Sequence, residues 1–389
     1  MSELFLPARL KVGPGALGNL GEIVKDLHAS HLFIVTGSLM TKEPFQTRLK
    51  FLINESALKS TFFTGIHGEP TTKHVTAALS KLKESGADCV VAIGGGSVID
   101  LAKAISVLAV EDCMELTSIP EMTSLKRLPL VAIPTTAGTG SEATKVTVIT
   151  DTAKNVKLNP GHTGLIPDAA ILDPELSVSL PKALTAYTGL DALSHAMEAY
   201  VSVKATPMSD LFAIEAIRLI GEWLPKAYSD GGDMTARERM LLGSWHAGVA
   251  FSNSSTNLAH AMARPLGTLF HIPHGLSVAL LMPFVVEYSM ASARERYDDI
   301  AKALGCKGES KPGNNVTSRL VEFNDEFEIW RDGAAYFHDL KDFKTHMALL
   351  VRDALSGNGI LTNRQIPDGQ DIENIYQKLA SHLHMFQQA

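Results

Sequence analysis

Four side chains have the types and the spacing needed to bind a metal ion. Asp191 and His195 lie four residues apart in GLDALSHAMEAY, a segment with helical periodicity, so both project from one helix face. His260 and His274 follow in NLAHAMARPLGTLFHIPHG. One carboxylate and three imidazoles suit a divalent first-row transition metal, and a further open position suits Lewis-acid catalysis rather than a purely structural site. The pattern therefore predicts a catalytic metal centre.

Glu198 shares the predicted helix face of Asp191 and His195. A fifth protein ligand would crowd the open coordination position, so we interpret Glu198 as a residue that supports the ligands, or as a structural residue. The chain has 14 histidines, and ordinary surface or core histidines are the alternative to a metal centre.

A glycine-rich turn forms a second candidate site. Gly94-Gly95-Gly96-Ser97 ends the apolar run CVVAI and opens the helical pattern VIDLAKAI. Glycines let the backbone approach a ligand closely, and a helix N-terminus attracts phosphate. Ser97 and Asp100 also form an S-x-x-D capping pattern, which favours a structural role for Asp100. The turn is not the G-x-G-x-x-G fingerprint, and many α/β proteins use such a turn only for packing.

A hydroxyl-rich segment, PTTAGTGSE, follows the next apolar run LVAI and spans residues 134–142. Its hydroxyls and backbone N–H groups suit contacts to phosphate and amide groups, and a polar surface loop is the alternative. The candidate ligand contacts in this segment are Thr135, Thr136, Thr139 and Ser141.

The order of apolar runs indicates how these segments are positioned. HLFIVTG, DCVVAIGGG and LPLVAIPTT are typical of buried strands, and helical patterns such as TTKHVTAALSKLKESG lie between them. The alternation predicts a parallel sheet with flanking helices. From about Thr185 only long helical patterns remain. We therefore predict an α/β domain over residues 1–182 and an all-helical domain over residues 183–389, and we expect an exposed loop over residues 308–318.

Composition excludes several classes of protein. A net charge of −7 without a run of Lys or Arg argues against a nucleic-acid partner. The apolar run LSVALLMPFVV is too short to span a bilayer, so no membrane association is expected. Cys89, Cys113 and Cys306 are far apart and form no C-x-x-C, which fits a reducing cytoplasm without disulfides.

These segments together resemble the iron-dependent (group III) alcohol dehydrogenase family of the dehydroquinate synthase-like superfamily. The likeness lies in D-A-x-x-H, a later His and P-H-G, in GGGSVIDLAK, and in PTTAGTGSE, and it weakens after about residue 290. It implies Fe(II), with Zn(II) or another divalent ion as alternatives, bound by the carboxylate and three imidazoles above. It also implies an N-terminal dinucleotide-binding domain and a hydride transfer between NAD(P) and a metal-polarised alcohol or carbonyl.

The resemblance adds further cofactor residues. Lys157 lies where the family places a lysine that contacts the cofactor. NAD-specific members often carry Asp at the position of Gly37, where a carboxylate would repel a 2′-phosphate. Gly37 removes that repulsion and Ser38 can donate to a phosphate, so we favour NADP(H). The alternative is that Gly37 only shapes a turn.

The chain departs from the family pattern near the metal. Arg264 replaces a His that faces the substrate in many members, and Arg is no base at neutral pH. His271 is a candidate to relay the proton, with water, cofactor hydroxyls or a purely structural His271 as alternatives. Asn257 replaces a small residue, and Phe251 lies where the family lines the substrate cleft, unless it is core. Arg264 either recognises an anionic substrate or pairs with an internal carboxylate.

We therefore expect an enzyme that acts on a small alcohol or aldehyde and forms a homodimer or larger homo-oligomer. Within the superfamily, glycerol dehydrogenase-like and hydroxyacid-oxoacid transhydrogenase-like enzymes are the alternatives. A non-catalytic metal- or nucleotide-binding protein is the alternative from another class.

Overall fold

The chain divides into two compact units, which are described separately. One unit is Phe5–Ser179, and the other is Leu180–Ala389 with Met1–Leu4. The predicted domain boundary after residue 182 lies close to this division and stays a prediction. The computed structural model describes residues 3–37, 43–66, 68–111, 115–154, 156–306, 312–337 and 340–387.

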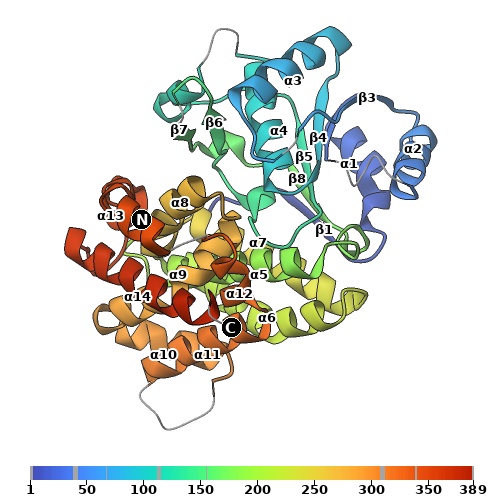
Figure 1. Cartoon of the computed structure of the whole chain (residues 1–389). Coiled ribbons are helices and arrows are strands. Elements are labelled where there is room, and N and C mark those ends of the chain that lie inside the picture. The colour runs from blue at the N-terminus through green and yellow to red at the C-terminus, as the bar shows by residue number, and fades with distance from the viewer. Residues whose placement is uncertain are drawn as a thin grey trace. The chain divides into compact units, whose positions relative to one another are not determined.

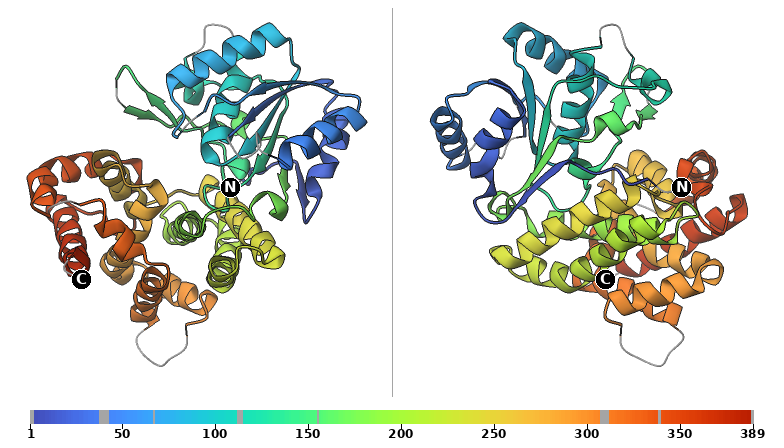
Figure 2. Two further views of the ribbon diagram at one scale, coloured as in Figure 1. Left: turned by 45° about the vertical axis from the view of Figure 1, so that its right-hand side comes forward. Right: turned by 180° about the vertical axis from the view of Figure 1, so that it is seen from behind.

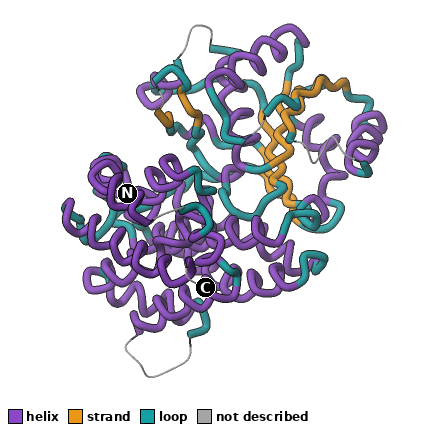
Figure 3. The backbone as a smooth tube through the Cα atoms, viewed as in Figure 1, coloured by secondary structure: helices purple, strands orange, loops and turns teal. Residues whose placement is uncertain are grey.

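The first unit is built on a parallel sheet of six strands (Figures 1 and 3). They are β1 (Arg9–Val12), β2 (His31–Thr36), β3 (Lys59–Phe63), β4 (Cys89–Gly94), β5 (Leu130–Pro134) and β8 (Ala169–Leu172). Their order across the sheet is β1-β8-β5-β4-β2-β3. A separate antiparallel pair consists of β6 (Ile149–Asp151) and β7 (Val156–Leu158). The predicted parallel sheet is confirmed, and the three predicted strands are β2, β4 and β5.

Helices cover both faces of this sheet, as Figures 1 and 2 show. They are α1 (Leu20–Asp26), α2 (Phe45–Glu55), α3 (Thr72–Ser85) and α4 (Gly96–Leu108). Successive residues of β2 point to opposite faces, because the side-chain period of a strand is two. Phe33 and Val35 pack in the core beneath α3 and α4, whereas Leu32 and Ile34 pack in the core beneath α1 and α2.

The strand order reverses between β2 and β4, which are neighbours in the sheet. The chain runs outward from β2 to β3, and then returns to β4 and continues through β5 to β8 on the other side. Ligands of open α/β sheets bind outside the carboxyl ends of the strands at such a reversal. Thr36 pairs with Ile93, so Gly37 and Gly94 follow at this same edge.

The second unit is helical throughout its described residues and contains no strand there, which confirms the predicted change of class. Its helices are α5 (Lys182–Val201), α6 (Pro207–Ser229), α7 (Met234–Ser252), α8 (Leu258–Phe270), α9 (His274–Ser289), α10 (Arg294–Ala303), α11 (Pro312–Glu326), α12 (Ile329–Ala334), α13 (Leu340–Leu355) and α14 (Gly369–Gln387). Short 3-10 turns lie at Ala16–Asn19, Leu116–Glu121, Ser141–Ala143, Thr163–Leu165, Pro174–Leu176, Met290–Ser292 and Asn358–Ile360.

The predicted loop over residues 308–318 is wrong from Pro312 onward, because α11 begins there. Proline is tolerated in the first turn of a helix, where its missing N–H has no acceptor. Residues 308–311 lie outside the described part of the chain.

The apolar stretch that begins with helix α9 is longer than the run LSVALLMPFVV that it contains. The stretch His274–Ser292 has 19 residues and a mean hydropathy of 1.4, which is long and apolar enough to cross a membrane by length and composition alone. However, 61% of it is buried inside the structure. Burial on this scale is typical of a core helix, which is apolar on most of its faces.

Candidate metal centre and cofactor site

Helix α5 places Asp191, His195 and Glu198 on one face, since intervals of four and three residues each correspond to about one helical turn. All three side chains are buried, with exposed fractions of 4%, 7% and 2%. Charged and imidazole groups are seldom buried unless they have partners, so this face of α5 requires an explanation beyond packing.

His260, near the start of α8, joins Asp191 and His195 in one cluster. Their possible ligand atoms all lie within 4.8 Å of one another, and the rings of His195 and His260 stack with centroids 4.4 Å apart. Within the described ranges, Oδ1 of Asp191, Nδ1 of His195 and Nε2 of His260 are buried without a hydrogen-bond partner. Nε2 of His260 lies 3.4 Å from Oδ1 of Asp191, which is long for a directed hydrogen bond. Three such atoms fit a bound cation.

His274, the first residue of α9, lies on the accessible side of this cluster. Its Nε2 is 3.7 Å from Oδ1 of Asp191, and its side chain is 42% exposed. The structure thus brings together all four residues that were predicted to bind metal. The neighbouring Gly275 makes this approach possible, because a Cβ there would lie 2.3 Å from the carbonyl oxygen of Tyr187 on α5.

Burial and neighbouring charges set the protonation states of the cluster. Burial lowers the pKa of His195 to about 4, so this imidazole is neutral at pH 7. Burial also acts to lower the pKa of His260, but the carboxylates of Glu198 and Asp191 outweigh it and hold that pKa above its usual value. Burial acts to raise the pKa of Asp191, but the surrounding imidazoles outweigh it and hold that pKa well below its usual range. Asp191 is therefore ionised.

Glu198 contacts the ring nitrogen of His260 that does not face Asp191. Its carboxylate contacts Nδ1 of His260 and accepts a hydrogen bond of 2.7 Å from the backbone N–H of Ala259. The side-chain amide of Asn257 donates to the backbone carbonyl of Glu198 at 2.7 Å. A carboxylate behind an imidazole fixes the orientation of a ligand histidine. Asn257 therefore links α8 to α5 rather than capping α8 with its side chain.

Three further predicted residues lie on α7, on α8 and at the end of α8. The ring of Phe251, on α7, stacks on His195 with centroids 4.4 Å apart. Arg264 lies one turn after His260 on α8 and is exposed, although dense surroundings partly desolvate it and lower its pKa. His271 ends α8 in the left-handed conformation, with φ of 56°, and is exposed.

The glycine-rich turn lies against the hydroxyl-rich segment, residues 134–142, in the first unit. We call residues 134–142 the threonine segment. The backbone N–H of Thr135 donates to the carbonyl oxygen of Gly94 at 3.0 Å. A Cβ on Gly96 would lie 2.8 Å from Oγ1 of Thr139, so only glycine permits this contact. An added Cβ on Gly95 would lie 3.4 Å from Oγ1 of Thr136. Hydroxyls and backbone N–H groups from both segments thus lie at the start of α4, where phosphate binding is favoured.

The predicted capping pattern of Ser97 and Asp100 is wrong. The residue that caps α4 is Gly95, and no side chain bonds to the cap. Because α4 begins at Gly96, Ser97 already lies inside its first turn. Asp100 instead binds the segment after the threonines, where it contacts the hydroxyl of Ser141 and other groups.

The remaining predicted cofactor residues have different surroundings. Among the described residues, the one atom that a Cβ on Gly37 would contact is Cγ2 of Val98, at an ordinary 3.9 Å. Lys157, on β7, pairs with Glu69 at 2.6 Å, and among the described residues its ammonium makes no contact with the glycine-rich turn. Ser38 lies outside the described residues.

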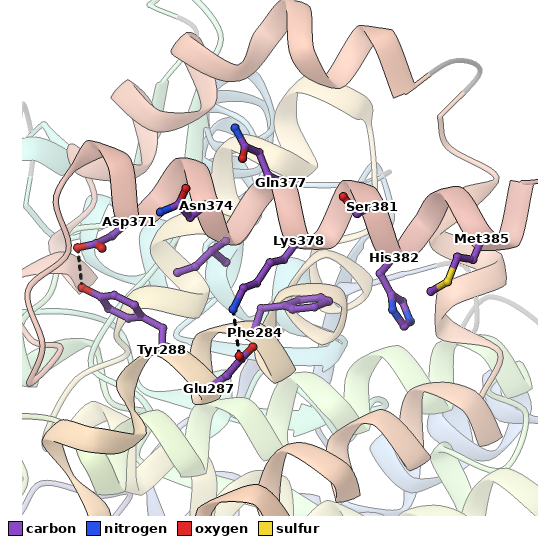
Figure 4. A pocket seen from close by; sticks show the side chains of 11 residues that line it. Phe284, Glu287, Tyr288, Asp371, Asn374, Gln377, Lys378, Ser381, His382 and Met385 are labelled. Carbon is purple, nitrogen blue, oxygen red and sulfur yellow. Dashed lines mark hydrogen bonds and ion pairs between the residues drawn. The ribbon is translucent and has the colours of Figure 1, made fainter.

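A groove of about 800 Å³ lies between α9 and α14 and contains none of the predicted site residues (Figure 4). Lys378 contacts Glu287 at 3.0 Å and Tyr288 donates to Asp371 at 2.9 Å, whereas Nε2 of His382 is buried without a hydrogen-bond partner among the described residues. The groove holds no cluster of potential metal ligands among the described residues. The candidate centre is therefore the cluster around Asp191.

A two-domain fold with these glycine and threonine segments and a buried carboxylate–imidazole cluster defines a metal-dependent dehydrogenase. Residues 7–174 match the family "Iron-containing alcohol dehydrogenase", and residues 185–380 match "Fe-containing alcohol dehydrogenase family, C-terminal". The chain is 43% identical over 311 residues to the probable alcohol dehydrogenase EutG of Escherichia coli, covering 79% of each protein. The chain belongs to the iron-containing alcohol dehydrogenase family, and it is an oxidoreductase of that family.

Solved structures share the fold over almost the whole chain. A 1,3-propanediol oxidoreductase has a TM-score of 0.91 and 30% identity, with 97% of this chain and 100% of that chain covered. Sulfoacetaldehyde reductase from Bifidobacterium kashiwanohense, solved in complex with NAD+, has a TM-score of 0.87 and 27% identity, with 98% and 99% covered.

Proposed function

We propose that this chain interconverts small alcohols and aldehydes with NAD(P) and Fe(II), and that Asp191, His195, His260 and His274 hold the metal. The observation that carries the proposal is the set of buried, unpartnered atoms on the first three of these residues, in the part of the chain that the structure describes. When bound, the metal supplies a Lewis acid that polarises the substrate oxygen. Zn(II) or another divalent ion is compatible with the same ligands.

Neighbouring side chains of the helical unit hold the proposed ligands in position. Glu198 holds Nδ1 of His260, so the free Nε2 faces Asp191. Phe251 packs on His195 and restricts the rotation of its ring. His271, which is exposed at the end of α8, remains our candidate for moving a proton to solvent.

We place the cofactor at the carboxyl ends of β2, β4 and β5. The glycine-rich turn Gly94–Ser97 and the threonine segment, through Thr135, Thr136, Thr139 and Ser141, supply the backbone and hydroxyl contacts for its phosphates, and Lys157 adds a cation from β7. The nicotinamide supplies the hydride acceptor or donor. The glycine at position 37 supports NADP(H) over NAD(H), because this residue has no carboxylate to repel a 2′-phosphate.

The activity is tested with protein reconstituted anaerobically with Fe(II) and assayed on alcohols and aldehydes with both cofactors. Chelation should abolish turnover, and Fe(II) should restore it. His260→Ala should abolish turnover while the α/β unit still binds cofactor in a direct binding measurement. Full activity in a metal-free preparation contradicts the proposal.

Arg264 supports an anionic substrate. It lies one turn after His260, so both residues project from similar faces of α8. Among the described residues, its guanidinium has no carboxylate partner, and burial is the cause of its lowered pKa. A partly desolvated cation without a partner is unfavourable, and an anionic group on the substrate would compensate it through paired hydrogen bonds. We propose an aldehyde or alcohol that carries a carboxylate, sulfonate or phosphonate. The similar sulfoacetaldehyde reductase, by its name, acts on such an aldehyde.

Matched aldehydes with and without an anionic group test this proposal. In Arg264→Gln, the KM for the anionic aldehyde should rise about 10- to 100-fold, because one or two hydrogen bonds to a charged group are lost. The KM for the neutral aldehyde should change little. Arg264→Lys should retain part of the selectivity, and Arg352→Gln, on an exposed face of α13, serves as the control. An equal effect on both aldehydes rejects anion recognition.

We further propose a cytoplasmic homodimer or larger homo-oligomer. The described cysteines, Cys89 and Cys306, are unpaired, which suits a reducing compartment. Exposed apolar side chains such as Leu211 and Leu361, at 67% and 72%, suit contact with a second subunit. Light scattering after size exclusion measures the number of subunits, and a monomer contradicts the proposal.

A further inference from the structure

A lysine in the α/β unit is completely buried, which is rare for this residue type. Lys103 lies on α4, three residues after Asp100, so both side chains share one face of that helix. Its ammonium donates three hydrogen bonds of 2.8 Å, to the carbonyl oxygen and hydroxyl of Thr144 and to the carbonyl oxygen of Val146. An ammonium has three protons, so all of its donors are used.

Asp100 fastens the same segment one turn earlier. Its carboxylate contacts the hydroxyl of Ser141 and accepts a hydrogen bond of 3.0 Å from the backbone N–H of Val148. Its backbone carbonyl accepts a hydrogen bond of 2.7 Å from the hydroxyl of Thr147. Together with Lys103, Asp100 therefore binds the segment 141–148 to α4 at both of its ends.

A gain in the free energy of folding does not explain why the charges of Lys103 and Asp100 are retained here. Burial lowers the pKa of Lys103 to about 8, against the opposing effect of Asp100 and Glu142, so the ammonium remains charged at pH 7. Moving an ammonium and a carboxylate out of water costs desolvation free energy, which their hydrogen bonds and the attraction between the charges largely offset, so the net gain in stability is small. What the arrangement provides is a fixed geometry for the segment that it holds.

The segment held by Lys103 continues directly from the threonine segment. Ser141 is the last of the predicted cofactor contacts and is itself bonded to Asp100. The other end of the threonine segment is fixed by the bond from Thr135 to Gly94. Since Lys103 has no exposed surface, it can affect a bound cofactor only indirectly, and its hydrogen bonds lead to this segment.

We propose that Lys103 and Asp100 are positioning residues that hold the threonine segment in the conformation that binds the cofactor. The inference rests on the proposed cofactor site. It assigns a task to Asp100 and Lys103 of GGGSVIDLAK, which are not among the predicted cofactor contacts.

The test compares Lys103→Met with the wild type in the full-length, metal-loaded protein. We expect the Kd for NADPH, measured by calorimetry, to rise about tenfold or more, the equivalent of one lost hydrogen bond to a charge. The KM for the cofactor should rise in parallel, while kcat at saturating cofactor and the bound metal stay close to wild type. Hydrogen exchange of peptides that cover residues 135–148 should accelerate. Lys81→Met, an exposed lysine on α3, is the matched control.

If Lys103→Met does not fold, the same measurements on Thr144→Val test the proposal, because this variant removes one acceptor of the ammonium and keeps the lysine. A wild-type Kd and wild-type exchange in a folded variant overturn the proposal. A wild-type protein that binds no cofactor overturns the cofactor site itself, so the two failures are distinguishable.

Discussion

Glu198 contacts Nδ1 of His260, and this contact leaves Nε2 as the ring nitrogen that faces Asp191. The contact joins α5 to α8 and determines which of the two nitrogens can coordinate. Since a ligand imidazole must present a lone pair, the carboxylate behind it selects the tautomer as well as the orientation of the ring.

We predict that Glu198→Gln weakens metal binding by about 10- to 100-fold, the usual effect of changing a residue that orients a ligand histidine. The variant keeps the size of the side chain and removes its charge, so His260 loses its strongest acceptor. Competition with a chromophoric chelator measures the affinity. Glu222→Gln, a change at an exposed position of α6, is the control, and an unchanged Kd in Glu198→Gln would contradict the assignment.

Metal binding should release a proton from His260. The carboxylates of Glu198 and Asp191 hold the pKa of His260 above its usual value, so the metal-free imidazole is protonated at pH 7, and coordination requires the neutral form. Affinity should therefore rise with pH, by about tenfold per unit below the raised pKa. His195, with a pKa lowered by burial to about 4, contributes no proton. Calorimetry in two buffers with different ionisation enthalpies counts the protons, and a flat affinity between about pH 6 and 8 would refute this sign.

Gly37→Asp should weaken NADPH about tenfold more than NADH, since a carboxylate repels the 2′-phosphate and accepts from the 2′-hydroxyl. We expect the substitution to be sterically tolerated, because among the described residues an added Cβ would meet only Val98, at 3.9 Å. Gly37→Asn has the same shape without the charge and is the control. Equal weakening of both cofactors would leave Gly37 as a turn residue only.

Gly275→Ala should destabilise the helical unit by about 1–3 kcal/mol, as overpacking of a core usually does. The added Cβ would lie 2.3 Å from the backbone oxygen of Tyr187, and backbone cannot yield as a side chain can. The start of α9 would move, and metal affinity should fall because His274 is the residue directly before Gly275. Thermal unfolding and metal titration check both effects. Gly369→Ala, where the nearest atom to the new Cβ is 3.5 Å away, should be close to neutral.

The strands that sequence patterns identified are those with continuous apolar runs. All residues of β4 and β5 are buried, so their sequences are apolar throughout. The edge strands β1 and β3 read RLKV and KSTFF, and their partial exposure permits polar residues, which hides the strand pattern. β8 is buried but consists of AAIL, and alanine is a poor indicator of strands.

Sequence spacing predicts only those site residues that lie close together along the chain. Asp191 and His195 were recognisable because one helix carries both residues, whereas the role of Lys103 depends on Thr144, which is 41 residues away. The same reason explains the wrong capping pattern at Asp100, whose partners Ser141 and Val148 lie in a distant segment. That no carboxylate among the described residues pairs with Arg264 is likewise a property of the fold rather than of its neighbours in the sequence.

The unequal burial of the four proposed ligands has a kinetic consequence. Asp191, His195 and His260 are enclosed, whereas the side chain of His274 is 42% exposed. In the proposed centre, solvent and small chelators would therefore reach the ion from the side of His274. Purified protein should then exchange its metal without unfolding.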